Sequence, residues 1–151
     1  MHLSRVRFAT ISLLAATMAA CGSEGPIVPI PADLDSQRAA WAVQNLSSYS
    51  YDYTESGYFI CCTEGQEVTL DVRNDTVVSA VFTATGQPVT VPHTRFPTIN
   101  ELFDRAEQAL RNQSLKDIAF DTQLHYPVRI AFAGLPDASG WVLAVRLRSP
   151  E

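Results

Sequence analysis

The fold follows from the stretch VTLDVRNDTVVSAV, residues 68–81, which has the pattern of a β-hairpin. Val68, Leu70 and Val72 alternate with polar residues, and this two-residue period is typical of a strand with one buried face. Residues 74–75, Asn-Asp, then form a tight turn, because both residue types tolerate the left-handed backbone of two-residue hairpin turns. The sequence therefore predicts an antiparallel sheet that contains this hairpin.

The turn also predicts the register of the hairpin. The pairs are Val72 with Val77, Leu70 with Ser79, and Val68 with Val81. One face of the hairpin is then mostly apolar and needs a second layer to cover it. A further edge strand is predicted over residues 89–91, limited by Pro88 and Pro92, because proline cannot donate a hydrogen bond to a β-ladder.

Strand patterns also occur on both sides of the hairpin. Tyr49, Tyr51 and Tyr53 alternate with polar residues, which predicts a strand. For this tyrosine row we favour packing in the core with solvated hydroxyl tips, and binding of sugars or aromatic ligands is the alternative. Nearer the C-terminus, the predicted strands cover residues 118–120, 128–132 and 141–147, and residues 134–140 link the last two.

A first amphipathic helix is predicted over residues 34–46, with Asp33 or Asp35 as its N-terminal cap. Its apolar stripe at helical spacing consists of Ala39, Ala42, Val43 and Leu46. Trp41 flanks this stripe, and we interpret it as a packing residue rather than a platform for a ligand.

A second helix begins after Thr98, because Thr98 and Glu101 have the spacing of a capping box. Its apolar face consists of Ile99, Leu102, Phe103, Ala106 and Leu110. Glu101, Asp104 and Glu107 lie off this face. We interpret these acids as solvated and not as a catalytic carboxylate pair.

The predicted order of elements is a helix, three or four strands, a second helix and three strands. This order is typical of an α+β domain, here an antiparallel sheet of about six strands with two helices packed on one face. With 46% hydrophobic and 18% charged residues, the 151-residue chain has the composition of a folded domain. The formal net charge of −5 and the lack of a basic block argue against nucleic acid as a partner.

The first twenty residues have the pattern of a secretory signal peptide. Arg5 and Arg7 make its start positive, and residues 8–20 form a short apolar stretch that ends in small residues. This stretch is too short for a permanent membrane-spanning helix. We therefore exclude residues 1–20 from the fold.

Residues 18–22, MAACG, resemble the lipobox of bacterial lipoproteins, in which the cysteine receives a diacylglycerol and the peptide is cut just before it. The resemblance implies that Cys21 is the lipidated N-terminus, and no other cofactor is expected. The alternative is an ordinary signal peptide followed by a chance cysteine. By resemblance to sorting rules, Gly22 gives no signal for inner-membrane retention, so the outer membrane, facing the periplasm, is expected in a Gram-negative cell.

The mature protein is expected to consist of an extended tether, residues 21–32, and a single domain, residues 33–148. Cleavage removes two of the eleven basic residues and none of the sixteen acidic ones, so the formal charge becomes −7. An acidic domain is repelled by anionic headgroups. The lipid is therefore the expected contact with the membrane.

Several motifs together resemble one known family. They are Trp41 before the tyrosine strand, a cysteine pair after it, the hairpin, the helix start TINELF and the segment FDTQLHYPVRI. The series resembles small bacterial secreted lipoproteins known only as a domain of unknown function, the 6174 type. Members often have Cys-x-Cys where this chain has Cys61-Cys62. The resemblance implies a fold and a location, but no activity.

Cys61 and Cys62 are the cysteines left for disulfide bonding once Cys21 is lipidated. Adjacent Cα atoms lie about 3.8 Å apart, which is less than the roughly 4.4–6.8 Å of ordinary disulfides. A vicinal bridge would therefore be strained and easily reduced. We favour a vicinal or intermolecular bridge over two free thiols, which would face opposite sides of a regular strand.

Two hypotheses bring histidines to the cysteines. A metal site would need Cys61, Cys62, His93 and His125 to converge. A nucleophile pair would use a cysteine with His93 or His125, oriented by Asp121. We expect neither a metal site nor a catalytic residue, and surface histidines are the simpler interpretation. Arg129 and Arg146 are candidates for binding an acidic ligand, although their alternation with apolar residues favours the solvated face of a strand.

The sequence thus predicts a non-enzymatic envelope lipoprotein that binds an envelope protein or a small ligand on its sheet or at a sheet edge. The alternative is a redox or metal-handling envelope protein that uses Cys61 and Cys62.

Overall fold

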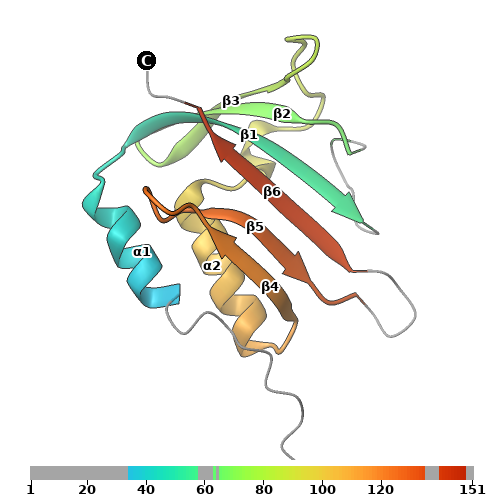
Figure 1. The fold of residues 1–151 in the computed structure, drawn as a ribbon. Coiled ribbons are helices and arrows are strands. Elements are labelled where there is room, and N and C mark those ends of the chain that lie inside the picture. The colour runs from blue at the N-terminus through green and yellow to red at the C-terminus, as the bar shows by residue number, and fades with distance from the viewer. Residues whose placement is uncertain (1–33, 58–62, 64, 135–139, 149–151) are drawn as a thin grey trace, which may run out of the picture.

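The computed structural model describes residues 34–57, 63, 65–134 and 140–148. In these residues a six-stranded antiparallel sheet combines with two α-helices, so the predicted α+β class is confirmed (Figure 1). The elements are α1 (Leu34–Val43), β1 (Ser48–Gly57), β2 (Val68–Arg73), β3 (Thr76–Phe82), the short 3-10 helix η1 (His93–Arg95), α2 (Ile99–Arg111), β4 (Leu115–Phe120), β5 (Pro127–Phe132) and β6 (Trp141–Leu147). No helix of this described part is long and apolar enough to cross a membrane.

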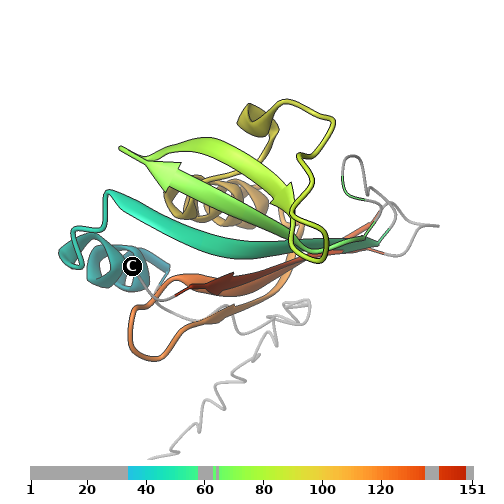
Figure 2. The same cartoon turned by 90° about the horizontal axis from the view of Figure 1, so that it is seen from above.

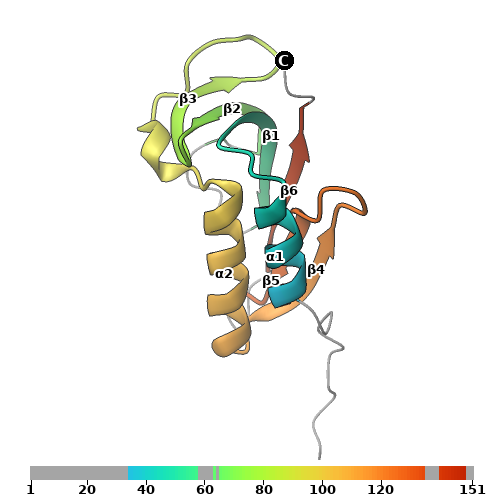
Figure 3. The ribbon, with the colours of Figure 1, turned by 90° about the vertical axis from the view of Figure 1, so that its left-hand side faces the viewer.

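The order of strands in the sheet is β3-β2-β1-β6-β5-β4, and every neighbouring pair is antiparallel. The first and last strands of the described residues, β1 and β6, therefore lie next to each other in the middle of the sheet (Figure 2). In Figure 3, α1 and α2 lie side by side. Contacts connect α2 with β4 and β5, and α1 with α2.

The predicted hairpin forms, with both turn residues, Asn74 and Asp75, in the left-handed conformation. Val72 pairs with Val77 as predicted, but the rest of the predicted register is wrong. A bulge after this pair shifts the partners, so the observed pairs are Leu70 with Ala80 and Val68 with Phe82. The physical reason is Val78, an extra residue that is 44% exposed and lets both Val77 and Ala80 face the core.

The predicted edge strand over residues 89–91 is also wrong. The pairing beside β3 is limited to an isolated bridge between Val81 and Pro88. Val89 is nevertheless buried, and its amide donates to the Ala80 carbonyl at 3.1 Å, so this segment covers the edge of β3 by packing and by a few backbone hydrogen bonds without forming a strand.

The first helix is shorter than predicted, and its buried face is different. It ends at Val43, and Asn45 adopts a left-handed conformation just after it. Val43 is 81% exposed, whereas Leu34 and Trp41 are buried. The large indole of Trp41 decides the orientation, because it contacts the ring of Tyr49 and donates a 3.1 Å hydrogen bond to Asn100. The packing role predicted for Trp41 is confirmed.

The second helix starts as predicted. The Glu101 amide donates to the Thr98 hydroxyl, and the Glu101 carboxylate accepts from the Thr98 amide at 2.7 Å, so the capping box is complete. The predicted solvation of its acids is confirmed for Glu101 and Asp104, which are exposed, whereas Glu107 is partly buried. Arg38 of α1 donates to Asp104 and, at 2.6 Å, to Glu107, so these carboxylates hold the two helices together.

Candidate functional site

The tyrosine row of β1 lies on the face of the sheet that packs against α2, and it is structural. Tyr49, Tyr51 and Tyr53 are all buried, so the predicted packing role is confirmed. The prediction of solvated hydroxyl tips is wrong for two of the three tyrosines. Tyr49 Oη accepts the Ile99 amide at 3.0 Å, and Tyr51 donates to the Pro97 carbonyl, so both bind backbone at the start of α2. Burial raises the pKa of Tyr49 to about 12.

Tyr53 and Glu55 follow along the same face of β1 and interact electrostatically with Arg105 of α2. Glu55 is only 9% exposed, and burial raises the pKa of its carboxyl, while the positive charge of Arg105 opposes that shift. Burial also raises the pKa of Tyr53, again with Arg105 acting in the opposite direction. Arg105 of α2 is therefore the electrostatic partner of two buried acidic groups on β1.

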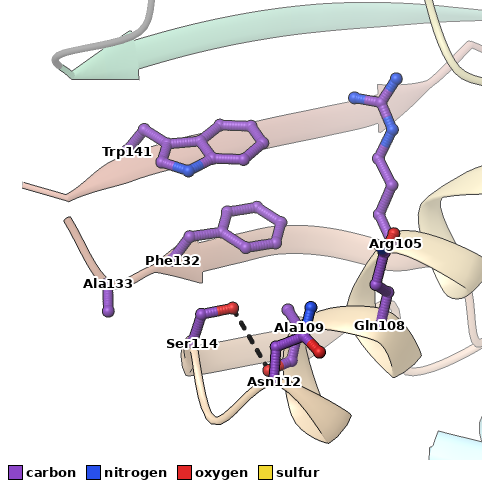
Figure 4. Close-up of a pocket in the computed structure, with 8 residues that line it drawn as sticks. All are labelled: Arg105, Gln108, Ala109, Asn112, Ser114, Phe132, Ala133 and Trp141. Atoms are coloured by element: carbon purple, nitrogen blue, oxygen red, sulfur yellow. Dashed lines mark hydrogen bonds between the residues drawn. The ribbon is translucent and has the colours of Figure 1, made fainter. Parts of the chain in front are cut away.

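Arg105 also lines an open groove between the C-terminal half of α2 and the end of the sheet (Figure 4). The cavity is about 200 Å³ in volume. Gln108 and Asn112 join Arg105 on the helix side, and Phe132 and Trp141 form the strand side. We call this cavity the Arg105 groove. It brings together one cation, two side-chain amides and two aromatic rings.

The two aromatic rings stack on each other. Phe132 of β5 and Trp141 of β6 are directly paired across the sheet. Their ring centroids are 4.0 Å apart, with 12° between the ring planes. Phe132 is buried, and Trp141 is partly exposed. The pair thus forms a flat, rigid apolar wall of which the indole is the accessible part.

The C-terminal end of α2 forms one end of the groove. Asn112 is the C-terminal cap residue, and Gln113 takes a left-handed conformation that turns the chain toward β4. The Ser114 hydroxyl donates to the Ala109 carbonyl at 3.3 Å (Figure 4). These contacts fix the backbone at the end of α2 that carries Gln108 and Asn112.

A cluster of charges lies on the other face of the sheet. Asp52 is only 3% exposed, and it accepts hydrogen bonds from Arg146 and Arg148, both at 2.7 Å, and from Thr69 at 3.0 Å. Burial alone would raise the pKa of Asp52, but these hydrogen bonds outweigh burial and lower it. The two oxygens of this carboxylate thus accept four hydrogen bonds from groups of the sheet and its edge. We interpret the cluster as structural.

The two arginines considered for an acidic ligand are in ion pairs. Arg146 contacts Asp52, and Arg129 pairs with Asp117 on the neighbouring strand. Both side chains are well exposed, as expected for the solvated face of a strand. Their predicted position is confirmed.

The structure does not bring His93, His125 and Asp121 together in the way that the nucleophile hypothesis needs. Asp121 accepts the amides of Gln123 at 2.9 Å and Leu124 at 2.7 Å, so its carboxylate shapes a turn.

His125 Nδ1 lies 3.0 Å from the side-chain oxygen of Gln37, and the His125 amide donates to the Asp121 carbonyl at 3.1 Å, so the hydrogen-bond partner of the ring is Gln37 and not the Asp121 carboxylate. His93 is in η1, which contacts β3 at one edge of the sheet, whereas His125 follows β4 at the opposite edge. The convergence of the two histidines that the metal hypothesis needs is therefore contradicted by the structure. Within the described ranges, no three or more His, Cys, Asp or Glu side chains form a group that could hold a metal ion.

Cys21, Cys61 and Cys62 lie outside the described residues. Lipidation of Cys21 and a bridge between Cys61 and Cys62 stay predictions.

The residues of the Arg105 groove were not predicted as a site. One signal was available, because Arg105, Gln108 and Asn112 follow a helical spacing of three and four residues, which places polar groups on one side of α2. The contribution of Trp141 and Phe132 has no such signal, since it depends on the pairing of β5 with β6.

An α+β domain with an aromatic and polar groove at the end of its sheet is the class of protein that these observations define. Residues 33–139 match the model of a family of unknown function, DUF6174, and the chain belongs to this family. The predicted family resemblance is thereby confirmed. No curated protein and no solved structure matches the chain.

Proposed function

We propose that this protein is a non-enzymatic binding module of the bacterial cell envelope that holds a small ligand in the Arg105 groove. In this proposal a lipid on Cys21 anchors it to the membrane, which is the outer membrane in a Gram-negative cell. The observation that carries the binding role is the groove itself. It presents a stacked aromatic pair together with a cation and two amides, so apolar surface and polar groups that can orient a ligand meet in one concave site.

The proposal includes the helix arrangement predicted from the sequence, with α1 and α2 on the same face of the sheet. Support comes from the side-by-side position of the helices in Figure 3 and from the Arg38 ion pairs to Asp104 and Glu107. In this arrangement the helices fill most of one face of the sheet. The groove at the end of α2 is then the place where a ligand reaches that face.

The charges beside the groove support binding rather than catalysis. Glu55 has Arg105 as its charge partner, and nothing in the described part pairs it with a second carboxylate for acid–base work. The Glu55 carboxylate instead attracts the Arg105 side chain, and the guanidinium offers its N–H groups to a ligand.

Tryptophan fluorescence tests the binding role, because the chain has only two tryptophans. The variant Trp41→Phe leaves Trp141 in the groove as the reporter. It keeps a ring beside Tyr49 and loses the hydrogen bond to Asn100, at a cost of about 1 kcal/mol. The low-molecular-mass fraction of the cell envelope should change the emission of this variant in a saturable way.

The matched control is Trp141→Phe, which leaves only the buried Trp41 and should not respond. No saturable change in the Trp41→Phe variant, or equal changes in both variants, would contradict a binding role of the groove.

A further inference from the structure

The polar and apolar parts of the Arg105 groove are separated in space. Phe132 and Trp141 form the strand side, whereas Arg105, Gln108 and Asn112 come from the helix (Figure 4). A ligand that fits must therefore have one flat apolar side and a polar rim. Its apolar side would pack on the exposed part of the Trp141 indole.

We propose that the ligand is a saccharide, with one sugar ring packed on Trp141. This inference rests on the proposed function. A sugar ring has a face of C–H groups and a rim of hydroxyl groups, each of which is both a donor and an acceptor. A side-chain amide also offers both a donor and an acceptor, and a guanidinium offers up to five donors. Gln108, Asn112 and Arg105 therefore match the rim, and the indole matches the C–H face.

The charges of the groove favour an uncharged sugar ring. Among the described residues that line the cavity, Arg105 is the one that is charged, and the buried Glu55 carboxylate on β1 opposes its charge. The pair largely cancels at a distance, so a strongly anionic or cationic ligand gains little from the site. Hydrogen bonds to neutral hydroxyls leave this balance of charges unchanged.

The size of the cavity also suits one ring. Its volume of about 200 Å³ is below the roughly 300–1,000 Å³ of pockets for drug-sized ligands. The groove is open, so the other rings of an oligosaccharide would extend into solvent. A larger planar ligand, such as a fused aromatic cofactor, would not find enough enclosed surface here.

Two trisaccharides test the proposal on the full domain in the Trp41→Phe background: N,N′,N″-triacetylchitotriose and maltotriose. At least one of them should change Trp141 emission with saturation. Gln108→Ala should weaken that binding about tenfold, because it removes a donor and an acceptor that contact the ligand. Gln108 is exposed, so this variant should fold like its parent. Arg105→Gln should weaken binding by at least as much.

The control variant is Arg111→Gln, on the same helix. Arg111 is exposed and pairs with Glu107 at 3.4 Å, away from the groove lining, so its removal should leave saccharide binding unchanged.

Two results would overturn the saccharide assignment: no saturable change with either trisaccharide, or equal affinity in the Gln108→Ala variant. If the envelope fraction still changes Trp141 emission in that case, the groove binds a ligand of another class and the proposed function stands. If neither the envelope fraction nor the trisaccharides have an effect, both proposals fail.

Discussion

Gly57 and Trp141 are direct partners across β1 and β6, and the backbone of the tryptophan occupies the place where a side chain at position 57 would start. A Cβ atom on Gly57 would lie 2.7 Å from Trp141 Cα and even closer to the Gly140 carbonyl oxygen. Gly57 also has a φ of +120°, a backbone conformation that residues with a Cβ atom rarely adopt. The aromatic wall of the groove thus depends on a glycine in the neighbouring strand.

Gly57→Ala should therefore destabilise the domain by about 2–4 kcal/mol, through backbone strain and the clash with residues 140–141. Urea unfolding measures the change. Gly86→Ala is the matched control, since Gly86 also has a positive φ, +68°, but has nothing within 4 Å of an added Cβ. It should cost about 1 kcal/mol. Equal losses in the two variants would show that the contact with Trp141 does not matter.

Asp52→Asn should destabilise the domain by about 1–3 kcal/mol at pH 7, because the hydrogen bonds from Arg146 and Arg148 lose their charged acceptor. The folded pKa of Asp52 is lowered, so its contribution is fully present above the unfolded value of about 3.9 and is lost as the pH falls through the folded pKa. Thermal melts between pH 7 and pH 2.5 should show the two proteins converging below pH 4. A constant difference over that range would rule out the carboxylate as the cause.

Glu55→Gln should change the stability of the domain in the opposite direction from Asp52→Asn. The folded pKa of Glu55 is raised, chiefly by burial and against the charge of Arg105, so ionisation of this group costs stability as the pH rises above the unfolded value of about 4.3. The glutamine variant should be more stable than wild type at pH 7, and the advantage should vanish below pH 4. A less stable variant at pH 7 would mean that the attraction to Arg105 exceeds the desolvation cost.

Thr98→Ala should cost about 1 kcal/mol, because the Glu101 amide loses its acceptor at the start of α2. Chemical denaturation measures the loss. The control is Thr90→Ala, because Thr90 is exposed and lies outside the helices and strands. This control should change the free energy of unfolding by less than about 0.5 kcal/mol. If both substitutions have equally small effects, the capping box does not stabilise the domain.

The features that were predicted correctly from the sequence are local ones. The capping box needs only Thr98 and Glu101, three residues apart, and the hairpin turn needs only Asn74 and Asp75. The family match over residues 33–139 agrees with the motifs read along the chain. Each of these signals is complete within a short segment, so no tertiary contact is needed to recognise it.

The features that were missed depend on contacts between distant segments. Ala42 and Val43 belong to the predicted apolar stripe of the first helix, but Trp41 is buried in their place because it meets Tyr49 from β1 and Tyr126 from the loop before β5. The bulge at Val78 depends on which side chains of β3 pack into the core, and much of that core comes from segments outside the hairpin. The Arg105 groove likewise exists only after α2, β5 and β6 come together.

The anchor is the part of the proposal that lies outside the described residues, and Cys21→Ser tests it. The serine variant keeps the signal peptide pattern of residues 1–20 but lacks the thiol that would receive the lipid. It should therefore move from the membrane fraction to the soluble fraction, since two or more acyl chains are needed for stable anchoring and the acidic domain is repelled by anionic headgroups. Immunoblots of fractionated cells measure the distribution, and Cys61→Ser is the matched control, which should stay with the membrane. Full retention of the Cys21→Ser protein in the membrane fraction would refute the lipid anchor and leave the groove without its proposed location.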